Sequence, residues 1–563
     1  MGRIKAPRKN FKPKPRLGGP QSKSETGDPQ EEIIYYYAAD VEKLLNDPAV
    51  VEIKIVEGSI EDSLDPSSLL TSDDEKFLVG VTRKEGKKVK EEWAAELVVG
   101  VRNGKKKRIN RPGARIKKLD NDDNKKDLLL SRTESHEKDK FEPVLKRIQA
   151  NILWHHKKKF AVYSFLTFAQ NKRSEATQWL SNLKLTSAYD QMNKENKVDT
   201  IRCAYLTYKG YEYLNIPSHL IPESGVSTFK AGPEERTVYT NRRQFKDKRY
   251  DTTTHMVLLE AFDDDSVSFE EKINEFKIAV SGFVDLSKSF FETAFTNFNG
   301  LKITQDWFGF QEGIGNPKFF SSKLDNSEKQ FNGPIPGNAP LNIVLTEDPN
   351  GVDAGCYGSF LVFLKLQQEV QNFEALSQDL GAAIGKSTEE AAELLIGRKK
   401  NGEPLVPLKI TDHNIKHDNY FDYSNDAEGK SCPFHAHIRK ANPRKNGFEE
   451  SNIVRRSMSY IETNKNELDQ AIVVERKGMF FMAFMRNIEQ QFERLVNYQM
   501  YDFDESDPNN APDPLIVDEN YIDRSYFNAN GQKESFSKAR KLVTYRGGIY
   551  LFAPSLPFFK NLD

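Results

Sequence analysis

Residues 432–444 read CPFHAHIRKANPR, a stretch in which His437 is followed at once by the cations Arg439 and Lys440 and then by Arg444. Two more arginines stand at positions 455 and 456, and apolar runs flank the whole segment. Because a buried cation needs an anionic partner, the pattern predicts an anionic group beside one imidazole. The alternative is an ordinary loop in which these cations face water.

Four histidines lie close together in this part of the sequence, and their grouping allows two interpretations. They are His413, His417, His435 and His437, with Cys432 among them. A zinc or non-heme iron site is one interpretation, but no second cysteine is nearby and the first two histidines lie in a polar, Asn- and Asp-rich stretch. Heme is the other interpretation, because its iron takes a proximal imidazole and its two propionates pair with cations.

A second stretch, DWFGFQEGIGNPKFF at 306–320, places Glu312 in a turn rich in glycine and phenylalanine. Glycines at 309, 313 and 315 and a proline at 317 predict a tight, irregular backbone. An aromatic setting disfavours the charged form of a carboxyl group, which makes Glu312 a candidate proton carrier. The alternative is a glutamate at the lip of a turn, paired with a surface arginine.

Around these two segments, the chain is predicted to be a mixed α+β protein from about residue 143 onward. Strand-like runs such as FAVYSFLTFA and GSFLVFLKLQ alternate with helix-like runs such as SFEEKINEFKIAVSGF and EVQNFEALSQDLGAAIG. The run VLKRIQANIL, at 144–153, is also predicted to be helical. Two successive mixed halves, 141–330 and 331–563, indicate an α+β fold with antiparallel sheets.

The first 140 residues differ in composition from the rest. The first 24 carry eight Lys or Arg and no acidic residue, which is typical of a disordered basic arm, here placed at 1–32. Residues 33–140 are predicted to form a small accessory region and a linker, with a strand at VVEIKIVEG and a strand pair around Asn103-Gly104. The basic stretch 102–118 indicates either a nucleic-acid-binding patch or a solvated, lysine-rich strand edge.

Composition excludes several classes of protein. The 563 residues include 82 basic and 83 acidic side chains, so no overall field attracts nucleic acid or anionic lipid. Three widely spaced cysteines argue against a disulfide framework and favour a reducing compartment. The longest strongly apolar run, at 479–485, is far shorter than the roughly 20 residues of a spanning helix. We therefore expect a cytoplasmic protein with no membrane partner.

Several segments, taken in order, resemble the dye-decolorizing peroxidase family. CPFHAHIRKANPR resembles its heme-ligand motif, GFQEGIGNP (309–317) its distal motif, and IVRRSM (453–458) the segment that supplies its distal arginine. Further similar segments are IQANIL, LIGRKKNGEPL, KGMFFMAFMRNIEQQFE and RGGIYLFAPS. The resemblance covers about residues 143–563 and none of the first 140.

The resemblance implies two ferredoxin-like halves, related to a dimeric α+β barrel, and one b-type heme held mostly by the second half. His437 would be the axial ligand of the iron. The other implied site residues are the catalytic Glu312 and Arg455, the cofactor-binding cations Arg444 and Arg439, the distal-side Met479 and Phe481, and Asp513 behind the proximal imidazole.

The implied activity is that of a heme peroxidase, which reduces hydrogen peroxide and oxidises dye-like or phenolic donors in one-electron steps. One position departs from the family: Glu312 stands where the motif has Asp. Proton transfer needs a heavy-atom reach of roughly 2.6–3.2 Å or one bridging water, so the longer arm either still reaches peroxide or crowds it. Two alternatives stay open: a heme-binding or heme-delivery protein with weak peroxidase activity, and nucleic-acid or partner binding through the basic N-terminal region.

Overall fold

In the computed structural model the chain divides into two compact units, Met1–Lys126 and Asp127–Asp563, which we describe separately. In the first unit the structure describes strand residues alone. In the second it describes residues 138–562 except 194–197, 226, 237–244, 252, 267, 302, 318, 320–338, 353–354, 409–420, 445–451, 465–473, 502–510 and 518–522. The basic arm predicted at 1–32, apart from its last residue, and most of the linker predicted near 120–140 lie outside these residues.

The first unit contains a sheet in the order β1-β5-β4-β3-β8, with β2 paired to β4, and a separate β6-β7 pair. The strands are β1 (Glu32–Ile33), β2 (Tyr35–Tyr37), β3 (Val50–Ile55), β4 (Lys76–Glu85), β5 (Lys88–Glu96), β6 (Val98–Arg102), β7 (Lys105–Ile109) and β8 (Arg115–Ile116). Arg102 lies opposite Lys105 in the antiparallel β6-β7 pair. The predicted strand at VVEIKIVEG and the predicted strand pair are thus confirmed.

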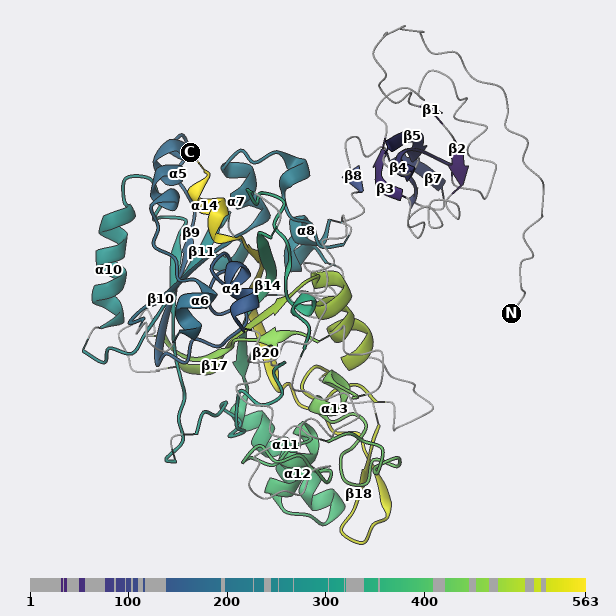
Figure 1. Ribbon diagram of the computed structural model, residues 1–563. Helices are drawn as coiled ribbons and strands as arrows, with labels where there is room; N and C mark the ends of the chain where they lie inside the picture. Colours follow the sequence, from purple (N-terminus) through teal and green to yellow (C-terminus); the bar gives the residue numbers. More distant parts are fainter. Residues whose placement is uncertain are drawn as a thin grey trace, which may run out of the picture. The chain divides into compact units, whose positions relative to one another are not determined.

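The first half of the second unit is an antiparallel sheet in the order β10-β11-β9-β12. Its strands are β9 (Phe160–Leu166), β10 (Ile201–Leu206), β11 (Met256–Phe262) and β12 (Phe290–Phe295). The helices α5 (Arg173–Ser181) and α10 (Phe269–Val280) follow β9 and β11. Ser268 caps α10, because its hydroxyl accepts a hydrogen bond from the backbone N–H of Glu271. The Glu271 carboxylate in turn accepts one from the backbone N–H of Ser268. Figure 1 shows α10 at the periphery, outside the strands.

The second half repeats this arrangement in the order β20-β14-β17-β16, again antiparallel. Its strands are β14 (Tyr357–Gln368), β16 (Met458–Asn464), β17 (Val474–Met485) and β20 (Val543–Ala553). The helix α11 (Val370–Ile384) follows β14, and the π-type helical segments η7 (Ile488–Glu493) and η8 (Leu495–Met500) follow β17. Both halves therefore have the same strand order in space. When the four strands of a half are numbered along the chain, the fourth lies beside the first, the first beside the third, and the third beside the second. The predicted pair of ferredoxin-like halves is confirmed.

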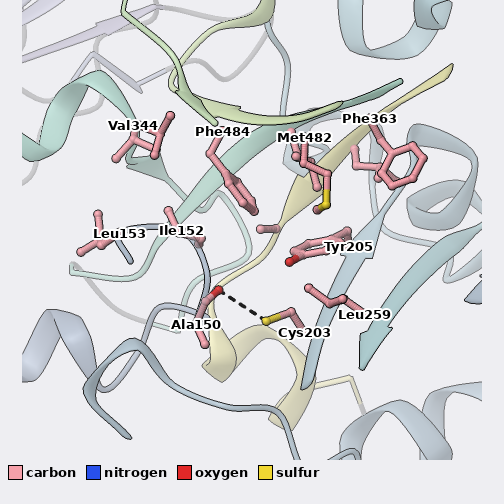
Figure 2. Packing of buried hydrophobic residues seen from close by; sticks show 14 of the residues in the cluster. Ala150, Ile152, Leu153, Cys203, Tyr205, Leu259, Val344, Phe363, Met482 and Phe484 are labelled. Carbon is pink, nitrogen blue, oxygen red and sulfur yellow. Dashed lines mark hydrogen bonds between the residues drawn. The ribbon is translucent and has the colours of Figure 1, made fainter. Parts of the chain in front are cut away.

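The two halves meet edge to edge. Leu206 of β10 pairs with Phe552 of β20, and Phe295 of β12 pairs with Ser459 of β16. Because β14 also pairs with β17, the pairings form a circuit of eight strands. Side chains alternate along the strands between an interior cluster, which includes Tyr205 and residues of both halves, and an outer cluster beneath the helices. Figure 2 shows Tyr205 of the first half beside Met482 and Phe484 of the second.

The segment predicted to be helical at 144–153 departs from that expectation. The helix α4 (Lys138–Leu145) ends at Leu145, and Asn151 adopts a left-handed backbone with φ of 67°. The side chain of the buried Gln149 donates to the carbonyls of Ala204 and Pro554, at 2.8 and 2.9 Å. These residues therefore form an irregular segment that connects the middle of β10 to the end of β20 instead of another helical turn.

The remaining short elements complete the second unit. They are α6 (Ala188–Met192), α7 (Tyr208–Tyr213), α8 (Thr228–Glu235), α12 (Thr388–Ile396), α13 (His437–Ala441), α14 (Leu556–Lys560), β13 (Thr346–Glu347), β15 (Val454–Arg455), β18 (Arg524–Phe527), β19 (Lys533–Phe536), η2 (Ser218–Leu220), η3 (Lys248–Asp251) and η5 (Leu341–Ile343). Of the helices in the described part of the chain, none combines the length and the apolar character that a bilayer-spanning segment requires.

Candidate heme-binding and catalytic site

A cavity of about 990 Å³ lies on the outer face of the second sheet. Its sheet side is formed by residues of β14, β17 and β20, and its helical side by residues of α13, η7 and η8. Loops from the first half, at 153–157 and 304–317, complete the lining. The predicted site residues that line this cavity are His437, Glu312, Arg455, Arg444, Met479 and Phe481.

His437 is the first residue of α13, and its imidazole is held in place by a buried carboxylate. Its Nδ1 lies 2.7 Å from Oδ2 of Asp513, a residue with none of its surface exposed. The other carboxylate oxygen of Asp513 accepts the backbone N–H of Leu515 at 2.8 Å. A carboxylate bonded to Nδ1 leaves Nε2 as the ring nitrogen able to ligate a metal. The structure thus brings His437 and Asp513 together, although 76 positions separate them in sequence.

Glu312 lies in the glycine-rich turn that the sequence predicts. Gly309, Gly313 and Gly315 all have positive φ angles, between 79° and 89°, which glycine adopts without strain. The backbone N–H of Glu312 donates to the carbonyl of Thr304 at 3.0 Å. Burial raises the pKa of the Glu312 carboxyl to about 7, and the negative charge of a neighbouring carboxylate adds to the shift while Arg455 opposes it.

That neighbouring carboxylate is Asp306, which also lines the cavity and which the sequence reasoning did not select. Its side chain accepts the backbone N–H of Phe310 at 2.9 Å and the amide of Gln368 at 3.3 Å. Burial raises the pKa of Asp306 to about 6. An aspartate that precedes a Gly-rich turn commonly bonds to the backbone of that turn, and this was the available signal. Asp306 therefore both shapes the turn and raises the pKa of Glu312.

Arg455 reaches the cavity from β15. The strand pairs with β17, where Arg455 lies opposite Ala483. The backbone N–H of Arg455 donates to Oδ1 of Asn316 at 2.9 Å, and its guanidinium Nη2 donates to the carbonyl of Ile314 at 3.0 Å. Burial lowers the pKa of this guanidinium, and Glu312 opposes that shift. The turn that carries Glu312 is therefore also the structure that holds Arg455.

The apolar sheet side of the cavity follows from strand alternation. Met479 and Phe481 are two positions apart on β17 and both line the cavity, whereas Phe480 between them belongs to the interior cluster. Leu364 and Leu366 of β14 extend the same surface. The result is an apolar surface on the sheet side of the cavity that His437 also lines.

Arg444 borders the cavity beyond α13. Its guanidinium lies 3.7 Å from the ring centre of Phe421 and donates to the carbonyl of the same residue at 3.1 Å. Burial lowers the pKa of Arg444. A half-buried cation at the border of an apolar cavity is suited to an acidic group on the edge of a flat ligand.

Arg439 was expected to bind the cofactor, and the structure corrects this. Arg439 does not line the cavity; its guanidinium pairs with Asp426 at 2.8 Å and also donates to the carbonyl of Cys432. The rings of Tyr423 and Phe434 lie 4.4 and 4.3 Å from it. In a helix, residues two positions apart point in different directions, so Arg439 cannot share the orientation of His437.

The alternative zinc interpretation rests partly on His413 and His417, which lie outside the described residues. Within the part of the chain that the structure describes, no three His, Cys, Asp or Glu side chains gather as a metal site would require. His435 is fully buried away from the cavity, with its ring 4.7 Å from that of Tyr526.

The residues present fit a heme. An imidazole with a buried carboxylate behind it, an apolar surface, a carboxyl and a guanidinium in the same cavity, and a cation at its border match what an iron porphyrin with acidic side groups needs. In class, these contacts define a candidate heme-binding cavity.

Comparison with known proteins makes the class specific. Residues 304–511 match the family model "Dyp-type peroxidase, C-terminal". The chain is 31% identical over 290 residues to the multifunctional dye peroxidase DyP2 of Amycolatopsis sp., a match that covers 47% of this chain and 62% of that protein. It is 28% identical over 297 residues to the dye-decolorizing peroxidase AauDyP1 of Auricularia auricula-judae, covering 46% and 56%. The matches thus span less than two thirds of these curated relatives.

A solved structure extends the likeness. The DyP-type peroxidase of Anabaena sp. aligns with 78% of this chain and 99% of its own length, at a TM-score of 0.67 and 27% identity. Residues 304–511 thus resemble the C-terminal part of this peroxidase family, and most of the second unit shares the fold of the Anabaena peroxidase.

Proposed function

We propose that this protein is a heme-dependent peroxidase that reduces hydrogen peroxide and oxidises dye-like or phenolic donors in one-electron steps. The observation that carries the proposal is the placement of Glu312 and Arg455 in the same cavity as His437 with its partner Asp513. The names of the relatives DyP2, a dye peroxidase, and AauDyP1, a dye-decolorizing peroxidase, support the substrate class.

The chemistry divides between the cofactor and the chain. The heme, when bound, supplies the redox-active iron. His437 would hold the iron through Nε2, and Asp513, bonded to Nδ1, would raise the basicity of that imidazole. Met479 and Phe481 give the ring an apolar surface, and Arg444 is placed to pair with an acidic group at its edge.

Glu312 is the proton carrier in this proposal. A carboxylate with a pKa of about 7 is ionised in part at neutral pH, so it accepts a proton from one oxygen of hydrogen peroxide and returns it to the other. Arg455 donates N–H groups to the negative charge that develops while the O–O bond breaks. Its guanidinium is fixed for this task by the carbonyl of Ile314.

Absorption spectroscopy of the purified protein, with hemin added and then with hydrogen peroxide, tests the proposal. Binding of hemin, a spectral change on adding peroxide, and oxidation of a phenolic donor are all expected. A protein that does not bind hemin would refute the proposal. A protein that binds hemin, yet neither responds to peroxide nor oxidises a donor, would favour the heme-binding alternative instead.

We also propose that the protein acts in the cytoplasm. Its three cysteines, Cys203, Cys356 and Cys432, are free thiols in buried positions. Burial raises the pKa of the Cys203 and Cys432 thiols to about 12, which keeps them protonated and unreactive. Fractionation of the source cells with an antibody to the protein tests this, and recovery outside the cytoplasm contradicts it.

A further inference from the structure

Arg456, the residue after Arg455, is a buried arginine whose guanidinium is bonded to backbone carbonyls. Its Nε donates to the carbonyl of Asn151 at 2.7 Å, its Nη2 to that of Ile152 at 2.8 Å, and its Nη1 to that of Arg455 at 2.9 Å. Only 3% of its surface is exposed. Arg456 therefore connects a loop of the first half to the strand that carries Arg455.

The environment of Arg456 is costly for a cation. Among the described residues no carboxylate forms an ion pair with it, in contrast to Arg439, which has Asp426. Burial, with a smaller contribution from the adjacent Arg455, lowers the pKa of Arg456 to about 9. A buried cation is stabilised when its donors are hydrogen-bonded, and here carbonyls accept bonds from all three nitrogens of the guanidinium. Arg456 is thus a buried cation that backbone carbonyls hold directly beside Arg455.

The loop that Arg456 binds is itself firmly anchored. The backbone N–H of Asn151 donates to Oε1 of Gln191 at 2.8 Å, and Ile152 and Leu153 are part of the interior cluster. Figure 2 shows Ile152 and Leu153 near Val344 and Phe484, so residues of both halves surround the loop. The first half thus offers Arg456 two carbonyls at fixed positions.

The other end of the connection is Arg455 itself. The Arg456 guanidinium binds the Arg455 carbonyl, and the backbone N–H of Arg456 donates to Met482 of β17 at 2.7 Å. β15 contains only two residues, so the strand ladder alone holds Arg455 through a short pairing. The position of Arg455 therefore depends on contacts beyond β15.

We propose that Arg456 is a positioning residue that fixes Arg455 in the cavity by fastening its backbone to the 151–152 loop. Arg456 holds the peptide of Arg455, and Asn316 and Ile314 hold its N–H and its guanidinium. Loss of the Arg456 bonds frees the backbone on one side, and Arg455 then no longer meets an anion or peroxide at one fixed position. The proposal rests on the proposed function but concerns a different residue and a separate readout.

The test compares Arg456→Gln with the parent protein, both loaded with hemin. Cyanide affinity, measured from the heme absorption spectrum, reports on stabilisation of an anion by Arg455 without turnover; the rate of the reaction with peroxide is the second readout. Both are expected to fall at least about tenfold, since a misplacement of ~1 Å costs on the order of 10²-fold. Arg456→Lys, which keeps a cation but not the planar fork, should fall between parent and Gln.

Two controls separate positioning from general destabilisation. Arg202→Gln removes a guanidinium that bonds the buried Glu260 at 2.6 Å on β10 and β11, away from the cavity. It should lower the melting temperature and leave the cyanide affinity unchanged. In an Arg455→Ala background, Arg456→Gln should have little further effect on either readout, because a residue that acts through Arg455 has nothing left to position.

The outcomes decide the proposal. An equal loss from Arg456→Gln with and without Arg455, or an affinity that matches the parent protein, overturns it. If Arg456→Gln does not fold, Arg456→Lys is judged alone: a loss of about threefold that disappears in the Arg455→Ala background supports the proposal, and no loss overturns it. A parent protein that binds hemin and cyanide but does not react with peroxide would refute the proposed function, while the cyanide comparison would still test Arg456.

Discussion

The Nδ1 atom of His437 and the Oδ2 atom of Asp513 lie 2.7 Å apart, with the carboxylate completely buried and its other oxygen bonded to a backbone N–H. An anionic acceptor in this position fixes both the orientation and the tautomer of the imidazole. It also increases the basicity of the nitrogen that remains for the iron.

We expect Asp513→Asn to retain heme but to raise its reduction potential, because a neutral amide supports the oxidised iron less well than a carboxylate does. Peroxidase activity should fall by roughly 10–100-fold, the usual range for such partners. Spectroelectrochemical titration measures the potential. A potential identical to that of the parent protein would show that Asp513 does not tune the imidazole.

His437→Ala should abolish stable heme binding, because the axial ligand is lost. The measurement is the heme absorption that remains after hemin loading and gel filtration. His435→Ala is the matched control, since His435 is two residues away, fully buried and outside the cavity lining. The control should lose stability yet keep heme; full heme retention by His437→Ala would mean that another residue is the ligand.

Glu312 predicts a pH dependence of the reaction with peroxide. Its pKa of about 7 means that the ionised form, which accepts the proton, becomes more abundant as pH rises through neutrality. The rate should therefore rise with pH around 7, and Glu312→Gln should remove this limb and lower the rate by about 10²–10⁴-fold. Stopped-flow absorbance over about 2 pH units on either side of the carboxyl pKa measures both effects.

Two further measurements test this interpretation of Glu312. The first is the rate of Glu312→Asp: a faster reaction in the aspartate variant would show that the longer side chain impairs turnover in the parent. The second is the pH dependence of protein stability. Because the folded-state pKa lies above the ordinary value of 4.5, the native state retains a proton that the unfolded chain releases. Stability of the hemin-free protein should fall as pH rises from about 4.5 to 7, and less so in Glu312→Gln. Equal pH dependence in both would contradict the raised pKa.

Arg439→Met should lower the free energy of unfolding by about 3–5 kcal/mol, because it leaves the buried Asp426 without its cation. Cofactor affinity of the folded fraction should stay close to that of the parent protein, since Arg439 does not line the cavity. Urea denaturation and hemin titration measure the two effects. A large loss of heme affinity without a loss of stability would restore the original expectation of a cofactor contact.

Much of the fold could be predicted from the sequence, because long apolar runs and amphipathic helices are local signals. β9, β14, α10 and α11 all form where the pattern indicates them. The segment 144–153 could not be predicted, because its apolar spacing resembles a helix while its structure depends on Gln149 bonding two distant carbonyls. Local spacing does not contain such long-range bonds.

The site residues that belong to a motif could be predicted from the sequence. The residues whose role depends on contacts with distant parts of the chain could not. His437, Glu312 and Arg455 share the cavity as expected, while their catalytic roles stay predictions. Arg439 and Arg456 carry the same charge and lie near the same motifs, yet one bonds to a carboxylate and the other to backbone carbonyls. Which of several cations faces a ligand depends on partners that are remote in sequence.

The two junctions of the eight-stranded circuit have a consequence for how the protein opens. Each junction consists of a single pair of opposed residues, whereas the strands within each half are paired along most of their length. Backbone amides inside a half should therefore exchange with deuterium more slowly than those along the junctions, where the shared interior cluster is the main contact between the halves. Separation along the junctions would disturb the loop at 151–152 and Arg455 together while both four-stranded sheets remained intact.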